Sequence, residues 1–357
     1  MNLWIVPIIL FVILIILTIR KKFDKKWKKV VLLLLLIVGV LFSIFRFIVP
    51  LKPSLEPTGD EGIKYYTHFY KHKTNFSNMA TKGDEREIPV HIWTPKNLEE
   101  NSQKVFVFSH GSSGVGLSNE TLFKELASRG YIVLSLDHPH HSFFSTLSDG
   151  SRVYVDGNFM QNVMASQGSE DLEKTLQDLN NWLDIRLEDI EFVLEEITDE
   201  NRETEFEKAM DLNEIVLSGH SLGGSAMLGI GRKYPEKFKK MVILESPFVK
   251  DISKIENGEF VFISDDYPVS ILHIYSEALY GKMDEITTYE MNQRLIDKKD
   301  PKFVNKHIFG VGHIGLTDMS LISPIITNLI DGGLNTRQAP ETLIELNKIV
   351  LEYLENL

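Results

Sequence analysis

Residues 214–228 read EIVLSGHSLGGSAML. A short apolar run ends in the pattern Gly-x-Ser-x-Gly, with Ser221 at its centre, and small residues follow it. A buried strand that turns sharply into a helix holds such a serine at a strained bend, ahead of a helix N-terminus whose dipole favours negative charge. The bare pattern also occurs by chance in turns, but its position between a strand and a helix predicts that Ser221 is a nucleophile.

A serine that attacks a carbonyl needs two backbone N–H groups to hold the oxyanion that forms. One is expected from Leu222, the residue after the serine. The second is expected from the stretch VFVFSHGSSG at 105–114, an apolar run followed by a glycine-rich loop in which Ser112 is the predicted donor. His110 opens this loop, and we expect it to orient the backbone rather than to act as a base.

The general base should be a histidine late in the chain, because this arrangement orders the residues as serine, acid, histidine. His273 and His307 lie within apolar runs, where a core histidine is the ordinary interpretation. His313 lies in IFGVGHIGLTD, after an apolar run and between glycines, and is the predicted base. Two carboxylates end strands after the nucleophile, Glu245 and Glu277, and spacing alone does not decide between them.

The rest of the chain alternates apolar runs with helical patterns, which predicts an α/β fold with a mostly parallel sheet flanked by helices. The expected strands are 88–93, 105–109, 131–136, 215–218, 241–244, 269–275 and 304–309. The expected helices are 120–128, 171–197, 222–234, 289–297 and 340–357. Within the second helix, RLEDIEFVLEEI at 186–197 has apolar residues at steps of three and four, so we interpret it only as a core-facing helix. Segment 142–168 is long and weakly periodic, and we expect an insertion over about 142–200 to form a lid.

Charge and composition disfavour one class of partner and exclude cysteine-based sites. The net charge is −12, yet residues 1–50 carry eight Lys or Arg against one Asp, so the remainder carries −19. An acidic body of this kind disfavours nucleic acid as a partner. The chain has no cysteine, which excludes disulfides, thiolate catalysis and cysteine-based metal sites.

The N-terminal region, residues 1–50, is expected to form a membrane hairpin. Its apolar runs at about 2–19 and 30–50 are long enough to span a bilayer, and the loop RKKFDKKWKK at 20–29 is strongly basic. Short basic loops stay in the cytoplasm, so the body, residues 63–357 after a Pro- and Gly-rich linker at 51–62, should lie outside. Three other interpretations compete with the hairpin. The first run could be a cleaved signal peptide, the second could be a buried core helix, or one run could lie in the membrane interface and leave a single span.

In order along the chain, these motifs resemble an α/β-hydrolase of the platelet-activating factor acetylhydrolase family, the secreted or type II lipase-like group. The resemblance covers roughly Arg86 to Ser320 and rests on REIPVHIWTP, FVFSHGSSG, RGYIVLSLDHPHHS, RLEDIEFVLEEI, SGHSLGG, ILHIYSE and GVGHIGLTDMS. It implies a serine carboxylic-ester hydrolase without metal or cofactor, acting on short-chain or oxidised acyl esters, including those of phospholipids. The alternatives are a non-catalytic binding protein and an amide or peptide hydrolase on the same scaffold.

The resemblance also bears on the acid. The family's acid follows the strand after the nucleophile, typically as Leu-Asp, and the matching position here reads Leu244-Glu245. This favours Glu245, although the extra methylene of a glutamate keeps Glu277 as an alternative.

The segment DHPHHSFF at 137–144 is expected at the same edge of the sheet as the nucleophile. Its three imidazoles could suggest a zinc site, but they occupy one turn and do not easily converge on one centre. We predict instead that the substrate mouth is lined by His138, His140, Phe143 and Phe144.

Overall fold

The computed structural model describes residues 3–166, 168–199 and 202–355. The expected structure at residues 1–2, 167, 200 and 356–357 lies outside these ranges. The described residues form a mixed eight-stranded sheet in the order β1-β2-β4-β3-β7-β8-β11-β12. Its strands are β1 (Ile63–Lys73), β2 (Glu85–Pro95), β3 (Gln103–Ser109), β4 (Ile132–Leu136), β7 (Met210–His220), β8 (Lys240–Leu244), β11 (Ser270–Tyr275) and β12 (Phe303–His307). β1 and β2 run antiparallel to their neighbours, and the other strands are parallel.

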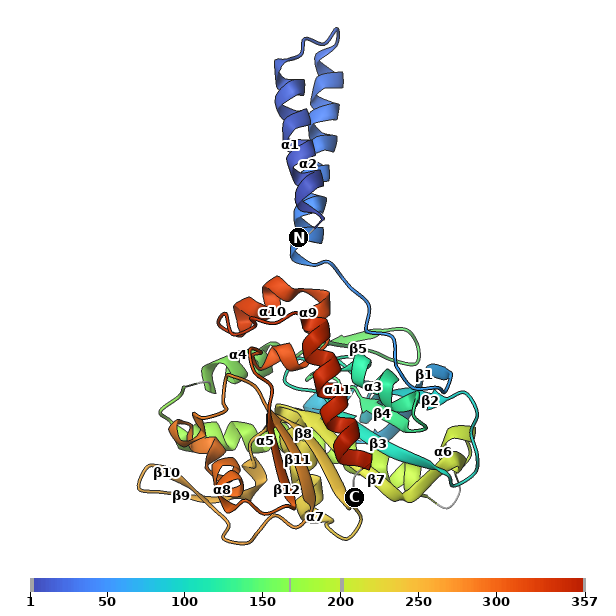
Figure 1. Cartoon of the computed structure of the whole chain (residues 1–357), viewed down its shortest axis with the longest axis vertical. Coiled ribbons are helices and arrows are strands. Elements are labelled where there is room, and N and C mark those ends of the chain that lie inside the picture. Colours follow the sequence, from blue (N-terminus) through green and yellow to red (C-terminus); the bar gives the residue numbers. More distant parts are fainter. Residues whose placement is uncertain (1–2, 167, 200–201, 356–357) are drawn as a thin grey trace.

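Helices cover both faces of this sheet (Figure 1). The α-helices of the body are α3 (Glu120–Ala127), α4 (Gly157–Ser166), α5 (Leu172–Thr198), α6 (Glu205–Ala209), α7 (Leu222–Lys233), α8 (Glu290–Lys298), α9 (Met319–Ile322), α10 (Pro324–Ile330) and α11 (Ala339–Glu355), and α5 and α7 pack on one face, α3 and α11 on the other. Alternate residues of β3 face opposite sides: Val105 and Val107 pack in the core with α5 and α7, whereas Phe106 and Phe108 pack with α3 and α11. The predicted α/β architecture is confirmed.

The segment predicted as a lid divides into two parts. Its first part holds the hairpin of β5 (Phe144–Thr146) and β6 (Arg152–Tyr154), followed by α4. Its second part is α5, whose residues Trp182, Leu183, Ile190 and Val193 are buried in the core beside the sheet. α5 is therefore a core helix rather than part of a lid, because its apolar stripe is already covered by the sheet and α7.

Several short or peripheral elements were not predicted from the sequence, including β1 at the edge of the main sheet. β1 pairs with β2 along its whole length, but its side chains are mostly half-buried or exposed, so it lacks the continuous apolar character of the inner strands. A second hairpin, β9 (Ile252–Glu256) with β10 (Glu259–Phe262), lies outside the main sheet. Edge strands and small hairpins of this kind carry little apolar signal.

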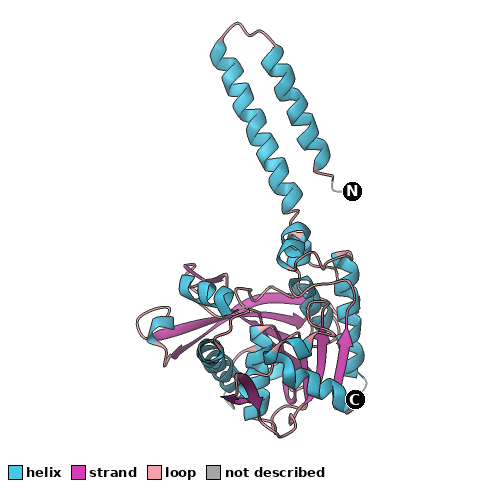
Figure 2. Ribbon diagram, turned by 90° about the vertical axis from the view of Figure 1, so that its left-hand side faces the viewer, coloured by secondary structure: helices cyan, strands magenta, loops and turns pink. Residues whose placement is uncertain are grey.

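The N-terminal helices α1 (Ile5–Arg20) and α2 (Lys26–Ile48) lie side by side and project from the body (Figures 1 and 2). Gly39 allows close contact between them, since a Cβ there would lie 2.8 Å from the ring of Phe11. Among the described helices, only α2 is long and apolar enough to cross a membrane alone; α1 is a shorter apolar helix of 16 residues.

The chain leaving α2 is joined to the body by hydrogen bonds. The hydroxyl of Ser323 donates to the carbonyl of Ile48 at 2.7 Å, and the N–H of Leu51 donates to the carbonyl of Ile322 at 3.1 Å. The end of α2 therefore lies against the start of α10.

Candidate active site

Ser221 occupies the bend between β7 and α7. Its φ and ψ are 53° and −128°, a conformation that non-glycine residues rarely adopt and that costs of order 1–3 kcal/mol. Its N–H donates to the carbonyl of Leu244 at 3.0 Å, and its own carbonyl accepts from the N–H of Ser225 at 3.0 Å. Gly223 makes room for the bend, since a Cβ there would lie 2.1 Å from the carbonyl oxygen of Ser109. The predicted strand–turn–helix context of the serine is present.

Glu245 follows the neighbouring strand β8 and is also strained. Its φ is 45°, its N–H donates to the carbonyl of Ile274 at 2.9 Å, and its side chain is fully buried. The carboxylate accepts hydrogen bonds from the N–H and, at 2.8 Å, the hydroxyl of Ser276. Its Oε1 also lies 2.7 Å from Nδ1 of His313. A buried carboxylate with this set of donors is held in one orientation.

His313 is positioned from its side chain and from its backbone. Burial alone would lower its pKa, but the hydrogen bond and the charge of Glu245 outweigh burial and raise the pKa above 6.5. The carbonyl of His313 accepts a hydrogen bond from Nε2 of His220 at 3.1 Å, and the centres of the two rings are 4.5 Å apart. Burial lowers the pKa of His220, which keeps it neutral. His313 thus lies beside the residue that precedes Ser221.

The backbone after His313 is held by Asp331, at the end of α10. Its two carboxylate oxygens accept the N–H groups of Ile314 and Gly315, each at 2.9 Å, and the amide of Asn335 at 2.7 Å. Asp331 had no signal in the sequence, because it lies beyond the histidine motif and its partners are main-chain groups.

Among the hydrogen bonds and ion pairs of the described residues, none joins Glu277, the alternative acid, to His313. Its carboxylate accepts the N–H of Gly310 at 3.1 Å and lies 3.7 Å from Nε2 of His307, and its N–H donates to the carbonyl of Val311 at 2.9 Å. Glu277 therefore holds the loop that leads to His313 rather than the imidazole itself.

The loop after β3 packs against the serine. A Cβ on Gly111 would lie 3.1 Å from Cβ of Ser221, so this peptide segment approaches the bend as closely as a glycine allows. His110 is buried, with Nδ1 2.7 Å from the carbonyl of Gly111 and Nε2 2.8 Å from the hydroxyl of Ser142. Because burial lowers its pKa, the neutral ring donates to that carbonyl and orients the loop. Of the predicted oxyanion donors, Leu222 directly follows the serine, and Ser112 follows Gly111 in this loop.

One prediction for the substrate mouth is wrong. His138 is fully buried, with Nδ1 2.8 Å from Asp189 and Nε2 2.9 Å from the hydroxyl of Ser109, so a substrate cannot reach it. His140 is half-buried, and its Nε2 lies 3.3 Å from the carbonyl of Ala80.

The other predicted residues of this segment have different surroundings. Phe143 is exposed, and Phe144 lies beneath the guanidinium of Arg152 at 5.3 Å. His141 stacks on Phe159 with ring centres 4.1 Å apart. The three imidazoles of the turn therefore face different partners, and the described residues contain no group of three or more His, Asp or Glu side chains that could hold a metal ion.

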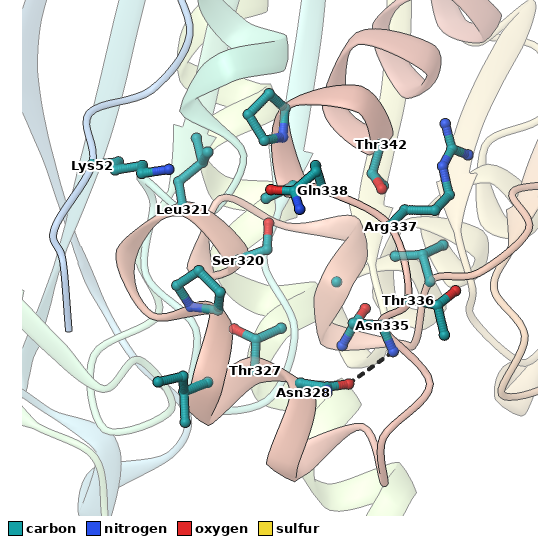
Figure 3. A pocket seen from close by; sticks show the side chains of 16 residues that line it. Lys52, Ser320, Leu321, Thr327, Asn328, Asn335, Thr336, Arg337, Gln338 and Thr342 are labelled. Carbon is teal, nitrogen blue, oxygen red and sulfur yellow. Dashed lines mark hydrogen bonds between the residues drawn. The ribbon is translucent and has the colours of Figure 1, made fainter. Parts of the chain in front are cut away.

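A cavity of about 370 Å³ lies between α9, α10 and the start of α11 (Figure 3). Side chains of Lys52, Ser320, Thr327 and Gln338 line it, and the backbone N–H of Asn335 donates to the side chain of Asn328, both also lining residues. None of Ser221, Glu245 and His313 is among the described residues that line this cavity, so it is separate from the candidate site.

Similarity to known proteins identifies the family of this chain. A sequence model of platelet-activating factor acetylhydrolase, isoform II, matches residues 59–326. None of the curated protein sequences compared with the chain matches it. Among solved structures, a ferulic acid esterase from Streptomyces cinnamoneus is similar at a TM-score of 0.59 and 16% identity, over 84% of this chain and 91% of that one. A putative dienelactone hydrolase from Klebsiella pneumoniae gives a TM-score of 0.44 and 14% identity, over 80% and 100%. The chain therefore belongs to the platelet-activating factor acetylhydrolase, isoform II, family, and is a carboxylic-ester hydrolase with the α/β-hydrolase fold.

Proposed function

We propose that the protein is a membrane-anchored serine esterase in which Ser221, His313 and Glu245 form the catalytic triad. The observation that carries this proposal is the 2.7 Å contact between Nδ1 of His313 and the buried carboxylate of Glu245, at the edge of the sheet where Ser221 occupies a strained bend. An imidazole fixed at Nδ1 by a carboxylate leaves Nε2 to accept a proton, which is the arrangement that activates a serine hydroxyl.

The reaction follows from these roles. His313 removes the proton of Ser221 as its Oγ attacks the ester carbonyl, and Glu245 stabilises the imidazolium that forms. The N–H groups of Leu222 and Ser112 hold the oxyanion of the tetrahedral intermediate. His313 then protonates the leaving alcohol, and a water molecule, deprotonated by the same histidine, hydrolyses the acyl-enzyme.

The proposed substrate is a short-chain or oxidised acyl ester, with an acetylated phospholipid as the first candidate. The family name refers to an acetyl ester of a phospholipid, and this is the support for that class. The resemblance to the ferulic acid esterase supports the fold alone, so it does not extend the proposal to aromatic esters.

We further propose that α1 and α2 both cross the membrane, with the basic loop between them in the cytoplasm and the body outside. The positive charge of this loop supports that orientation. The body is joined to the end of α2 at α10, and exposed apolar side chains follow there: Ile322, Ile325, Leu329 and Ile330. An apolar surface beside the end of a spanning helix suits contact with the bilayer, from which a lipid substrate would come.

Ester hydrolysis by the full-length chain tests the catalytic proposal. We expect the wild type to hydrolyse p-nitrophenyl acetate faster than long-chain esters, and Ser221→Ala to lose at least about 10⁴-fold in kcat. Ser225→Ala is the matched control, because this hydroxyl on α7 donates to the carbonyl of Pro247 at 2.7 Å. Undiminished hydrolysis by Ser221→Ala would contradict the triad. Absence of turnover by the wild type would favour a binding protein, and faster cleavage of matched amides would favour an amidase.

Cysteine labelling tests the orientation, since the chain has no cysteine to give a background. We expect a membrane-impermeant maleimide to label Lys348→Cys, on the exposed face of α11, in intact cells. Lys22→Cys, in the basic loop, should react only after permeabilisation. The reverse pattern would contradict the proposed topology, and labelling of both in intact cells would indicate a single span.

A further inference from the structure

The segment RLEDIEFVLEEI forms part of an amphipathic helix, yet two of its charged residues are as deeply buried as its apolar core residues. Arg186 and Asp189 on α5 are both fully buried, three residues apart on one face. A charge is rarely buried without a specific partner, because desolvation of an ion costs several kcal/mol. These two residues therefore need an explanation that helix packing does not give.

Arg186 donates to the main chain of the loop that packs against Ser221. Its Nη1 donates to the carbonyl of His110, and its Nη2 donates to the carbonyl of Gly111 at 3.2 Å. Nη1 also lies 3.4 Å from the hydroxyl of Ser109, the last residue of β3. A single guanidinium thus bonds to two consecutive carbonyls at the end of this strand.

The direction of these carbonyls decides where the N–H groups of the loop point. A trans peptide unit is planar, with its C=O and N–H directed to opposite sides. When Arg186 fixes the carbonyl of Gly111 toward α5, the N–H of Ser112 in the same peptide unit must point the other way. Gly111 lies beside Ser221, since a Cβ added to this glycine would be 3.1 Å from Cβ of the serine. Arg186 therefore acts with the ring of His110 and the N–H of Gly114, which bond to the same carbonyl, to direct the N–H of the predicted oxyanion donor away from α5.

The charges around Arg186 leave it without an anion of its own. Asp189 is occupied by Arg86, which donates Nε at 2.6 Å and Nη2 at 2.8 Å, and by His138. Burial lowers the pKa of His138 to about 4, so it is neutral, and two arginines share one carboxylate. Among the described residues no carboxylate forms an ion pair with Arg186, and its Nε has no hydrogen-bond partner. One positive charge thus remains buried behind the peptide units that would face an oxyanion.

We propose that Arg186 is a positioning residue for ester hydrolysis: its guanidinium fixes the peptide units at His110–Gly111 and Gly111–Ser112 so that they stabilise the oxyanion. The inference rests on the proposed function, because it assigns a role toward the Ser112 donor. Polarisation of each carbonyl by the cation strengthens the N–H of the same peptide unit as a donor. Asp189, held by Arg86 and linked through His138 to Ser109, fixes the strand end on which this arrangement is built.

The test compares Arg186→Lys and Arg186→Met with wild type in the full-length chain. Loss of one oxyanion donor costs about 10²–10³-fold in kcat, so Arg186→Met should lower kcat by about 100-fold with KM changed less than about threefold. Arg186→Lys keeps a charge but lacks the forked donors, and should lose about tenfold. The affinity for a trifluoromethyl ketone, which forms a tetrahedral adduct with serine, should fall by the same factor as kcat/KM.

Arg232→Met is the matched control, since Arg232 on α7 pairs with Asp251 at 2.6 Å away from the loop, and its kcat should stay within about twofold. If Arg186 only stabilised the fold, the folded fraction would fall while the remaining sites kept wild-type ketone affinity and kcat, and this result would overturn the inference. If Arg186→Met does not fold, Arg186→Lys decides: wild-type kcat and ketone affinity in that variant contradict the inference. Ser221→Ala separates the proposed function from the role of Arg186. An active Ser221→Ala enzyme refutes the proposed function. An inactive Ser221→Ala enzyme together with a fully active Arg186→Lys enzyme refutes only the role of Arg186.

Discussion

The neighbouring strands β8 and β11 each lead into a glutamate at the same edge of the sheet, yet the two carboxylates lie in different surroundings. Glu245, directly after β8, is fully buried and meets the imidazole of His313 at 2.7 Å. Glu277, two residues after β11, has a side chain that is 35% exposed and lies 3.7 Å from His307. Position at a strand end therefore does not by itself identify the acid that orients a histidine.

The loop that returns from β12 accounts for the difference. It passes over the end of β11, where the N–H of Glu277 bonds to the carbonyl of Val311 and its carboxylate to the N–H of Gly310. Only beyond this crossing does it bring His313 to the end of β8. Glu277 thus fixes the path of the loop, and Glu245 fixes the imidazole of His313 at the end of that loop.

The largest effect that separates the two regions is expected from Glu245→Gln. The amide cannot stabilise an imidazolium and favours the wrong tautomer of His313, so kcat should fall on the order of 10³–10⁴-fold. Steady-state hydrolysis of p-nitrophenyl acetate measures it. A fall of less than tenfold would mean that Glu245 does not act as the acid.

The next-largest difference between Glu245 and Glu277 is expected in the pH dependence of kcat/KM. The base must be neutral to accept a proton, so kcat/KM should rise with pH through the pKa of His313, with a midpoint above 6.5 in the wild type. Without the charge and acceptor of Glu245, burial dominates and lowers that pKa, so the residual activity of Glu245→Gln should rise at a lower pH. An unchanged midpoint in Glu245→Gln would contradict the assignment.

Asp331→Ala should have a smaller effect, because it acts on the backbone behind the ring. The change leaves the N–H groups of Ile314 and Gly315 without their acceptor and should let His313 shift. We expect a loss of about 10- to 100-fold in kcat. Asp331→Asn retains one acceptor oxygen and should lose less, and equal activity of Asp331→Ala and wild type would show that the backbone needs no such support.

The smallest effect is expected from Glu277→Gln. An amide oxygen can still accept the N–H of Gly310, so kcat should change by less than about threefold and the pH midpoint should stay in place. A loss equal to that of Glu245→Gln would remove the distinction between the two strand ends.

The sequence predicted the inner strands well because each is a continuous apolar run, and β3, β4, β7, β8 and β11 lie within a few residues of expectation. It located the bend at Ser221 because that turn requires glycines at fixed positions. It failed for β1, whose half-exposed side chains give no apolar run, and it extended the lid over α5, although the apolar stripe of residues 186–197 predicted a core-facing helix.

The candidate site was less predictable where its contacts join distant parts of the chain. The local pattern left Glu245 and Glu277 open, since the deciding contact spans 68 residues to His313. His138 was misplaced because a histidine in a polar turn gives no sign of burial, and its partner Asp189 lies 51 residues away. Arg186 carried no signal at all, because its acceptors are main-chain carbonyls 75 and 76 residues earlier.

The central claim is that Ser221 is a nucleophile activated by His313 and Glu245. The most direct measurement is reaction of the full-length protein with a fluorophosphonate, followed by mass spectrometry of the peptides. The triad predicts one adduct per chain, on Ser221, with none in Ser221→Ala and much slower formation in Glu245→Gln than in Glu277→Gln. An adduct on another residue, or equal labelling of wild type and Ser221→Ala, would contradict it.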